Sequence, residues 1–156
     1  MKKLFKTLLA VASLFILFAQ TSQVSAKSWQ VGRWSTTTKV AEPTKEENQL
    51  LQILEFAFDD SADVEFDVEE KVYSLNFYDK GFKQGLRDQL QGVPGASEEW
   101  QVLVDEFAGV SESIESVLGE GYFLNIMNPF NEDRIIASFR DGEAIFDIFN
   151  SSVKED

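Results

Sequence analysis

The chain has neither histidine nor cysteine among its 156 residues, and its 14 basic residues are outnumbered by 27 acidic ones. Without histidine and cysteine it cannot form disulfide bonds, thiol nucleophiles, Ser-His-Asp triads, or zinc sites with imidazole or thiolate ligands. Glycine-rich phosphate-binding loops are also missing. An enzyme built from this chain would therefore depend on carboxylate, tyrosine, lysine or arginine side chains. We predict no catalytic residues and no cofactor.

The shortage of basic residues gives the chain a net charge of −13 at pH 7. Phosphate backbones and anionic lipid headgroups repel a chain of this charge, so we expect neither a nucleic-acid partner nor stable membrane association. The partners left open are an unknown protein, an envelope component, or a second copy of the chain in a homo-oligomer.

The first 26 residues have the three-part layout of a secretory signal peptide. Lysines precede an uncharged apolar run, and Val24 and Ala26 occupy the −3 and −1 positions. The run is shorter than the ~20 residues of a membrane-spanning helix, so cleavage after Ala26 is favoured over a retained anchor. Cleavage changes the net charge from −13 to −16 over 130 residues, because it removes three lysines and no acid. We predict a secreted, extracellular protein.

The remaining chain suits a single domain with its own core. We expect a polar N-terminal arm at 27–42, one domain at 43–150 and a polar tail at 151–156. The arm carries two apolar anchors, Trp29 and Trp34.

Three segments show the apolar spacing of amphipathic helices. The first, 44–58, begins with Thr44 and Glu47, which match a capping box. The second, 80–90, carries apolar residues four positions apart. The third runs from a predicted N-cap at Ser97 to Gly119.

The segments 63–68 and 72–78 alternate between apolar and polar residues, which predicts two strands of a hairpin. A loop around Glu69-Glu70 would place Phe66 opposite Tyr73 and Val64 opposite Leu75. A further strand is expected at 122–127.

The final hairpin, 134–149, turns at Asp141-Gly142, a dipeptide that favours a type I′ turn. This register places Arg140 opposite Glu143, Ser138 opposite Ile145 and Ile136 opposite Asp147. It predicts one apolar face, made of Ile135, Ala137, Phe139, Ala144, Phe146 and Ile148.

The order α-ββ-αα-βββ indicates an α+β fold, an antiparallel sheet of about five strands with two to three helices on one face. A signal peptide, a charged hairpin, a helical middle, Asn128-Pro129 and the Asp141-Gly142 hairpin together resemble the small secreted proteins and lipoproteins of Gram-positive bacteria that carry a domain of unknown function. The resemblance covers about 44–150 and implies no activity. The chain departs from the lipoproteins because it has no cysteine to carry the lipid.

The many acidic residues leave two other functions open, one catalytic and one metal-dependent. Two carboxylates in one cleft would suit a small carboxylate-dependent hydrolase. A weak Ca²⁺ site, as in a calcium-dependent surface protein, is the other alternative, because the spacing after residue 58 resembles an EF-hand loop. Its candidate ligands are Asp59, Asp63, Asp67 and Glu70, but Val64 stands where that loop needs glycine.

Our main hypothesis is a binding or interaction module at or outside the bacterial envelope. Apolar residues on the sheet face opposite the predicted apolar one, together with the arm, form the candidate interaction face. Its members are Phe123, Met127, Ile136, Ile145, Phe149, Trp29 and Trp34.

Overall fold

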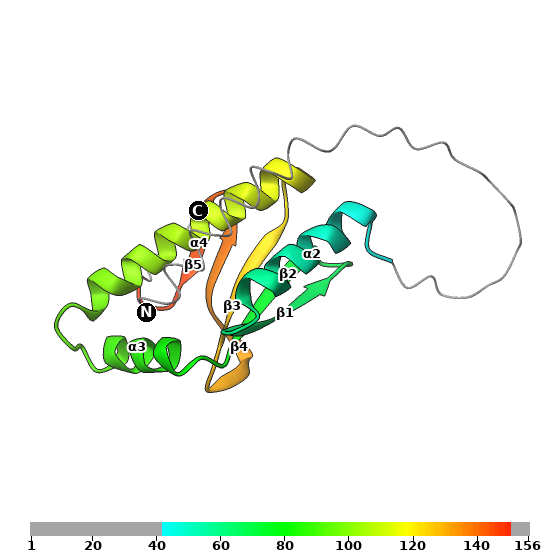
Figure 1. Cartoon of the computed structure of the whole chain (residues 1–156). Helices are drawn as coiled ribbons and strands as arrows, with labels where there is room; N and C mark the ends of the chain where they lie inside the picture. The colour runs from blue at the N-terminus through cyan, green and yellow to red at the C-terminus, as the bar shows by residue number, and fades with distance from the viewer. Residues whose placement is uncertain (1–41, 151–156) are drawn as a thin grey trace, which may run out of the picture.

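The computed structural model describes residues 42–150, which form a five-stranded sheet with helices packed on one of its faces (Figure 1). The elements follow the order α2 (Lys45–Phe58), β1 (Ala62–Asp67), β2 (Val72–Phe77), α3 (Lys80–Leu90), α4 (Ala96–Leu118), β3 (Phe123–Asn128), β4 (Asn131–Arg140) and β5 (Glu143–Asp147). The predicted α+β class and element order are confirmed.

The strands lie in the sheet in chain order, from β1 at one edge to β5 at the other. Three of the four neighbouring pairs are antiparallel, whereas β2 and β3 are parallel. A parallel pair needs a long crossover, and α3 and α4 provide it. The sequence predicts an antiparallel sheet, and the structure corrects this, because one of its strand pairs is parallel.

Helix α2 packs on β1, and α4, the longest helix, packs on β3, β4 and β5. Figure 1 shows both helices over the sheet, with α3 beside the start of α4. Between the helices and the sheet, the rings of Phe58, Phe77, Phe107 and Phe139 form one aromatic cluster. This arrangement leaves the opposite face of the sheet without a helix in the described part of the chain.

The start of α2 has the predicted capping box. Thr44 Oγ1 accepts a hydrogen bond from the Glu47 backbone N–H (3.2 Å), and the Glu47 carboxylate accepts one from the Thr44 N–H (2.6 Å). Helix α4 differs from the prediction, because its N-cap is Gly95, at φ +87°, and not Ser97. The Ser97 hydroxyl lies in the first turn and donates to Gln89 (3.2 Å).

The hairpin of β1 and β2 has the predicted register, including Phe66 opposite Tyr73 and Val64 opposite Leu75. The loop between these strands is closed by Asp67, whose carboxylate accepts hydrogen bonds from the N–H groups of Glu69 (2.9 Å) and Glu70 (3.0 Å). Local alternation was enough to predict this pairing, since a one-residue slip would expose the apolar side chains.

The register of the final hairpin is correct only beside its turn. Asp141 and Gly142 both have positive φ, as a type I′ turn requires, and Arg140 pairs with Glu143. Beyond Ala144 an extra residue, Ile145, bulges out of β5, so Ser138 pairs with Phe146 and Ala137 with Asp147. A second irregularity places Ile136 as the extra residue of β4 against β3.

These two bulges overturn part of the predicted apolar face. Ala137 and Phe139 are buried as expected, but Ile135, Ala144, Phe146 and Ile148 are exposed. The face that the sequence predicted to be dry is therefore split between the core and the solvent. A bulge shifts every following side chain by one position relative to the partner strand, which is why period-two reasoning failed here.

Candidate functional site

The uncovered sheet face carries a group of apolar side chains over β3, β4 and β5. Leu124 and Ile126 of β3 point into the core, so Phe123, Asn125 and Met127 lie on the opposite face. Their partners on β4 share that face, and the pairing continues to β5. We name four apolar members of this surface the outer patch: Phe123, Met127, Ile135 and Phe146.

The outer patch is accessible to solvent. Phe146 and Ile135 are 45% and 38% exposed, while Phe123 and Met127 are half-buried. Ile145 and Ile148, at the adjoining edge of the sheet, are also exposed. Single exposed apolar side chains are common on protein surfaces, but a contiguous group of them is typical of an interaction site.

A hydrogen-bonded polar pair lies in the middle of the outer patch. The Ser138 hydroxyl donates to the Asn125 side-chain oxygen across the β3–β4 pair (2.6 Å). Both residues are buried although they lie on the uncovered face. This hydrogen bond satisfies the Ser138 hydroxyl donor and the Asn125 side-chain oxygen.

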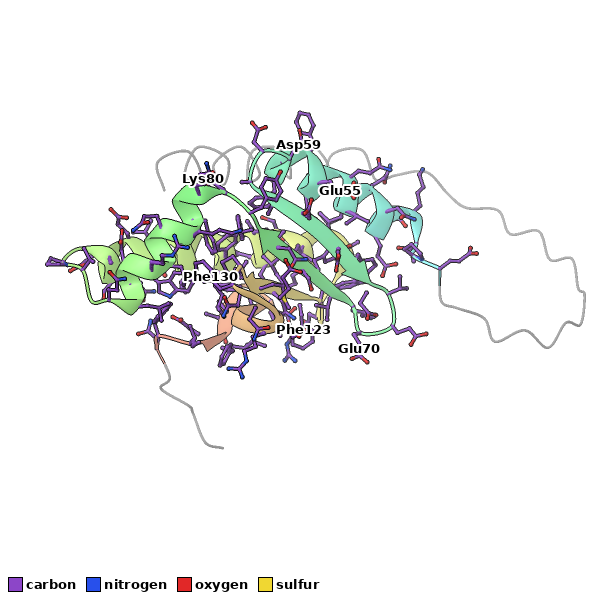
Figure 2. All side chains as sticks on the ribbon, turned by 90° about the horizontal axis from the view of Figure 1, so that it is seen from below. Glu55, Asp59, Glu70, Lys80, Phe123 and Phe130 are labelled. Atoms are coloured by element: carbon purple, nitrogen blue, oxygen red, sulfur yellow. The ribbon has the colours of Figure 1, made fainter. Side chains whose placement is uncertain are left out.

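One end of the outer patch is fixed by a chain of polar contacts. The Arg140 guanidinium lies over the Phe123 ring, 5.5 Å from its centroid, and its Nε is 3.3 Å from the Asp141 carboxylate. The same carboxylate accepts a hydrogen bond from the Gly121 N–H (2.9 Å). These contacts hold the Phe123 ring in place at the start of β3, near the turn that carries Glu70 (Figure 2).

The structure corrects two members of the predicted interaction face. Ile136 is only 1% exposed and belongs to the core, because the β4 bulge turns it inward beside Ala137. Phe149 packs edge-on against Trp100 of α4, with ring centroids 5.0 Å apart, so it lies on the helix side of the sheet. Phe123, Met127 and Ile145 remain accessible, and Trp29 and Trp34 lie outside the described residues.

Sequence reasoning missed two residues of the outer patch. Ile135 and Phe146 were assigned to the dry face, and both are exposed. The signal that could have corrected Phe146 is Asp147, since an acid in the predicted β5 pattern suggests a specific partner. That partner is the Trp100 indole, whose Nε1–H donates to the buried Asp147 carboxylate (3.0 Å).

The calcium candidates are spread along the opposite edge of the sheet. Asp59 ends α2, Asp63 and Asp67 lie four residues apart on β1, and Glu70 lies in the following turn. Four residues of strand span about 13 Å, much more than the first coordination sphere of one ion. No group of three acidic residues within residues 42–150 has the geometry to hold a metal ion.

Two acids of the described chain are buried, Asp147 and Glu47, and the Glu47 carboxylate joins α2 to the sheet. Its two oxygens accept hydrogen bonds from the Tyr122 hydroxyl (2.7 Å) and the Thr44 N–H (2.6 Å). Burial raises its pKa, but these hydrogen bonds and the Lys71 charge outweigh that effect, so the pKa lies below its ordinary value. Burial and the hydrogen bond to Glu47 raise the pKa of Tyr122 to about 12.

Within residues 42–150, no helix combines the length and apolar character needed to cross a bilayer. No protein-family model matches the chain, and neither a curated protein nor a solved structure is significantly similar to it.

Proposed function

We propose that the chain is a secreted binding module that recognises a partner in or outside the bacterial envelope through the outer patch. The observation that carries this proposal is the sheet face left without a helix in the described chain, with accessible Phe123, Met127, Ile135 and Phe146 around the hydrogen-bonded pair of Asn125 and Ser138. An apolar surface with a polar pair at its centre suits protein recognition, because interfaces typically combine an apolar core with a small number of hydrogen bonds.

The chemistry of the acids gives less support to a hydrolase. A general acid requires a carboxyl group with a raised pKa, whereas the pKa of Glu47 is lowered and both of its oxygens are engaged. The separation of the four acids, with Asp59 at the end of α2, Asp63 and Asp67 on β1 and Glu70 in the following turn, gives little support to a calcium-dependent function. The binding module is therefore the function that we put forward.

The outer patch can be tested by placing a photoreactive side chain at position 146 and, as a control, at position 56. Phe56 is a matched control because it is an exposed phenylalanine on α2, away from the uncovered face. We expect one dominant cross-linked envelope species from position 146 and none of that species from position 56. Phe146→Asp in the purified chain should abolish the complex, and Phe56→Asp should preserve it.

Equal effects of the two aspartate variants, in which both keep the complex or both lose it, would show that the outer patch is not the binding surface. Export is tested separately by mass spectrometry of the protein in the culture medium. We expect Lys27 as its first residue, and a product that keeps Met1 in the membrane would contradict secretion.

A further inference from the structure

The two edges of the sheet are protected against strand pairing to different degrees. Edge strands commonly carry charged side chains that prevent another strand from adding to them. The β1 edge has three exposed acids, Asp63, Glu65 and Asp67. The β5 edge has one exposed acid, Glu143, next to exposed Ile145 and Phe146, and a bulge at Ile145.

An acidic flank of α4 runs beside the β5 edge. At the hairpin end, a Cβ added to Gly142 would lie 3.2 Å from Glu112 Cβ, which places these two residues in contact. At the other end, the Asn150 amide donates to Gln101 (3.1 Å), and Gln101 in turn donates to Asp105 (2.9 Å). Asp105 and Glu112 are both exposed, and we name them the α4 flank.

From this arrangement we infer that the β5 edge accepts an extended segment of a partner protein in which basic and apolar side chains alternate. A strand added to β5 would turn one row of side chains toward the α4 flank and the other row toward the solvent side, next to Phe146. Side chains alternate between faces along a strand, so lysine or arginine suits the first row and apolar residues suit the second. The backbone would add hydrogen bonds that are independent of sequence.

The charge of the whole chain favours the same partner. With 27 acids against 14 basic residues, long-range attraction brings basic segments to the surface, and the α4 flank then selects those that alternate. Asp105 and Glu112 are seven positions apart on α4, which is about 10 Å along the helix axis. Two basic side chains on one face of a strand, two to four positions apart, can reach both.

This inference rests on the proposed function, because Phe146 belongs to the outer patch as well as to β5. It adds a rule of specificity that the outer patch alone does not impose. The partner segment must be extended, and its basic residues must be two or four positions apart in its sequence. A helical or globular partner on the outer patch would satisfy the proposed function without satisfying this rule.

The test uses the exported chain and three capped nine-residue peptides. The first alternates lysine and valine, the second has the same composition with all its lysines before its valines, and the third alternates glutamate and valine. We expect the first peptide to bind at least about tenfold more tightly than the other two. Its binding should slow amide hydrogen exchange in β5 (Glu143–Asp147) at the N–H groups that point away from β4, because these groups gain acceptors.

Charge reversal decides which surface selects the peptide. Asp105→Lys combined with Glu112→Lys should reverse the preference, so that the glutamate-valine peptide binds more tightly than the lysine-valine peptide. Asp63→Lys combined with Glu65→Lys makes the same change of net charge at the β1 edge and should keep the original preference. Equal effects of the two double variants would mean that net charge alone attracts the peptide, and the inference would be wrong.

Three other results would also overturn the inference. One is equal binding of the alternating and block peptides. Another is slow exchange in β5 that depends on protein concentration without peptide, which would identify a second copy as the occupant. The third is binding that appears only after Trp29→Ser with Trp34→Ser, which would identify the chain's own arm. If none of the peptides binds but Phe146→Asp still abolishes the envelope complex, only the inference about strand addition is wrong. If the complex survives Phe146→Asp, the proposed function is wrong.

Discussion

The carboxylate of Glu47 accepts a 2.7 Å hydrogen bond from the hydroxyl of Tyr122, a residue 75 positions later in the chain. Glu47 belongs to the first turn of α2, and Tyr122 immediately precedes β3. The Tyr73 hydroxyl also donates to the Glu47 backbone carbonyl (3.2 Å). Glu47 therefore completes the capping box of α2 and also joins this helix to the middle of the sheet.

We predict that Glu47→Gln lowers the free energy of unfolding by about 1–3 kcal/mol at pH 7, because buried hydrogen bonds to a charged group are lost. The lowered pKa of Glu47 means that this stabilisation is present above the ordinary value of 4.5 and disappears as the pH falls through the folded-state pKa. The difference between variant and parent, measured by urea unfolding, should shrink at acid pH. Glu55→Gln, an exposed position on the same helix (Figure 2), is the control and should change little.

Tyr122 should give the opposite pH dependence. Its pKa is raised from 10.0 to about 12, so its contribution is present below pH 10 and is lost as the pH rises through the folded-state value. Urea unfolding of Tyr122→Phe should therefore differ from the parent at pH 7 and converge with it in strong alkali. A difference that is constant from neutral to alkaline pH would contradict the hydrogen-bond assignment.

Two glycine substitutions should change stability in opposite directions. Gly142→Val introduces a β-branched residue at φ +80° and brings its Cβ to 3.2 Å from Glu112 Cβ, so we expect a loss of about 1–2 kcal/mol. Gly109→Ala lies within α4, where nothing is within 4 Å of the added Cβ, and helix propensity predicts a gain of up to ~1 kcal/mol. Thermal unfolding measures both. An unchanged midpoint for Gly142→Val would refute the type I′ turn.

The β5 bulge can be tested through Asp147. Its buried carboxylate accepts hydrogen bonds from the Trp100 indole, the Phe149 N–H and the Asn150 side-chain amide, each 3.0 Å long. Asp147→Ala should therefore cost about 1–3 kcal/mol, because it leaves the buried Trp100 N–H and the other two donors without this acceptor. Asp63→Ala, at an exposed position of β1, should change stability by less than about 0.5 kcal/mol. Equal, small effects would support the unbulged register, in which Asp147 faces away from α4.

We predict that the protein does not bind calcium in preference to magnesium. Because Asp63 and Asp67 extend along β1 and Asp67 caps the following turn, we expect millimolar concentrations of either ion to raise the melting temperature slightly and equally. Selective binding to the folded state would instead raise it in calcium alone. A large calcium-specific shift that Glu70→Gln removes would restore the EF-hand interpretation.

The sequence alone determined the features that depend on near neighbours in the chain. The capping box of Thr44 and Glu47 satisfies the backbone of a single turn, and the apolar spacing of α2, α3 and α4 follows the helical repeat. The register of β1 with β2 and the turn at Asp141-Gly142 also follow from local alternation and local φ preferences. Each of these signals involves residues that lie within a few positions of one another.

Only the tertiary structure decided which side chains reach solvent on β4 and β5. The bulges at Ile136 and Ile145 arise where the strands must bring Asp147 to Trp100 and still pack Ala137 and Phe139 against α4. A bulge adds one residue without breaking the local alternation, and the acid that hints at it, Asp147, finds its partner, Trp100, 47 positions away. The parallel β2–β3 pair and the contact between Glu47 and Tyr122 likewise join segments far apart in the chain, and the free energy of packing the whole domain selects them.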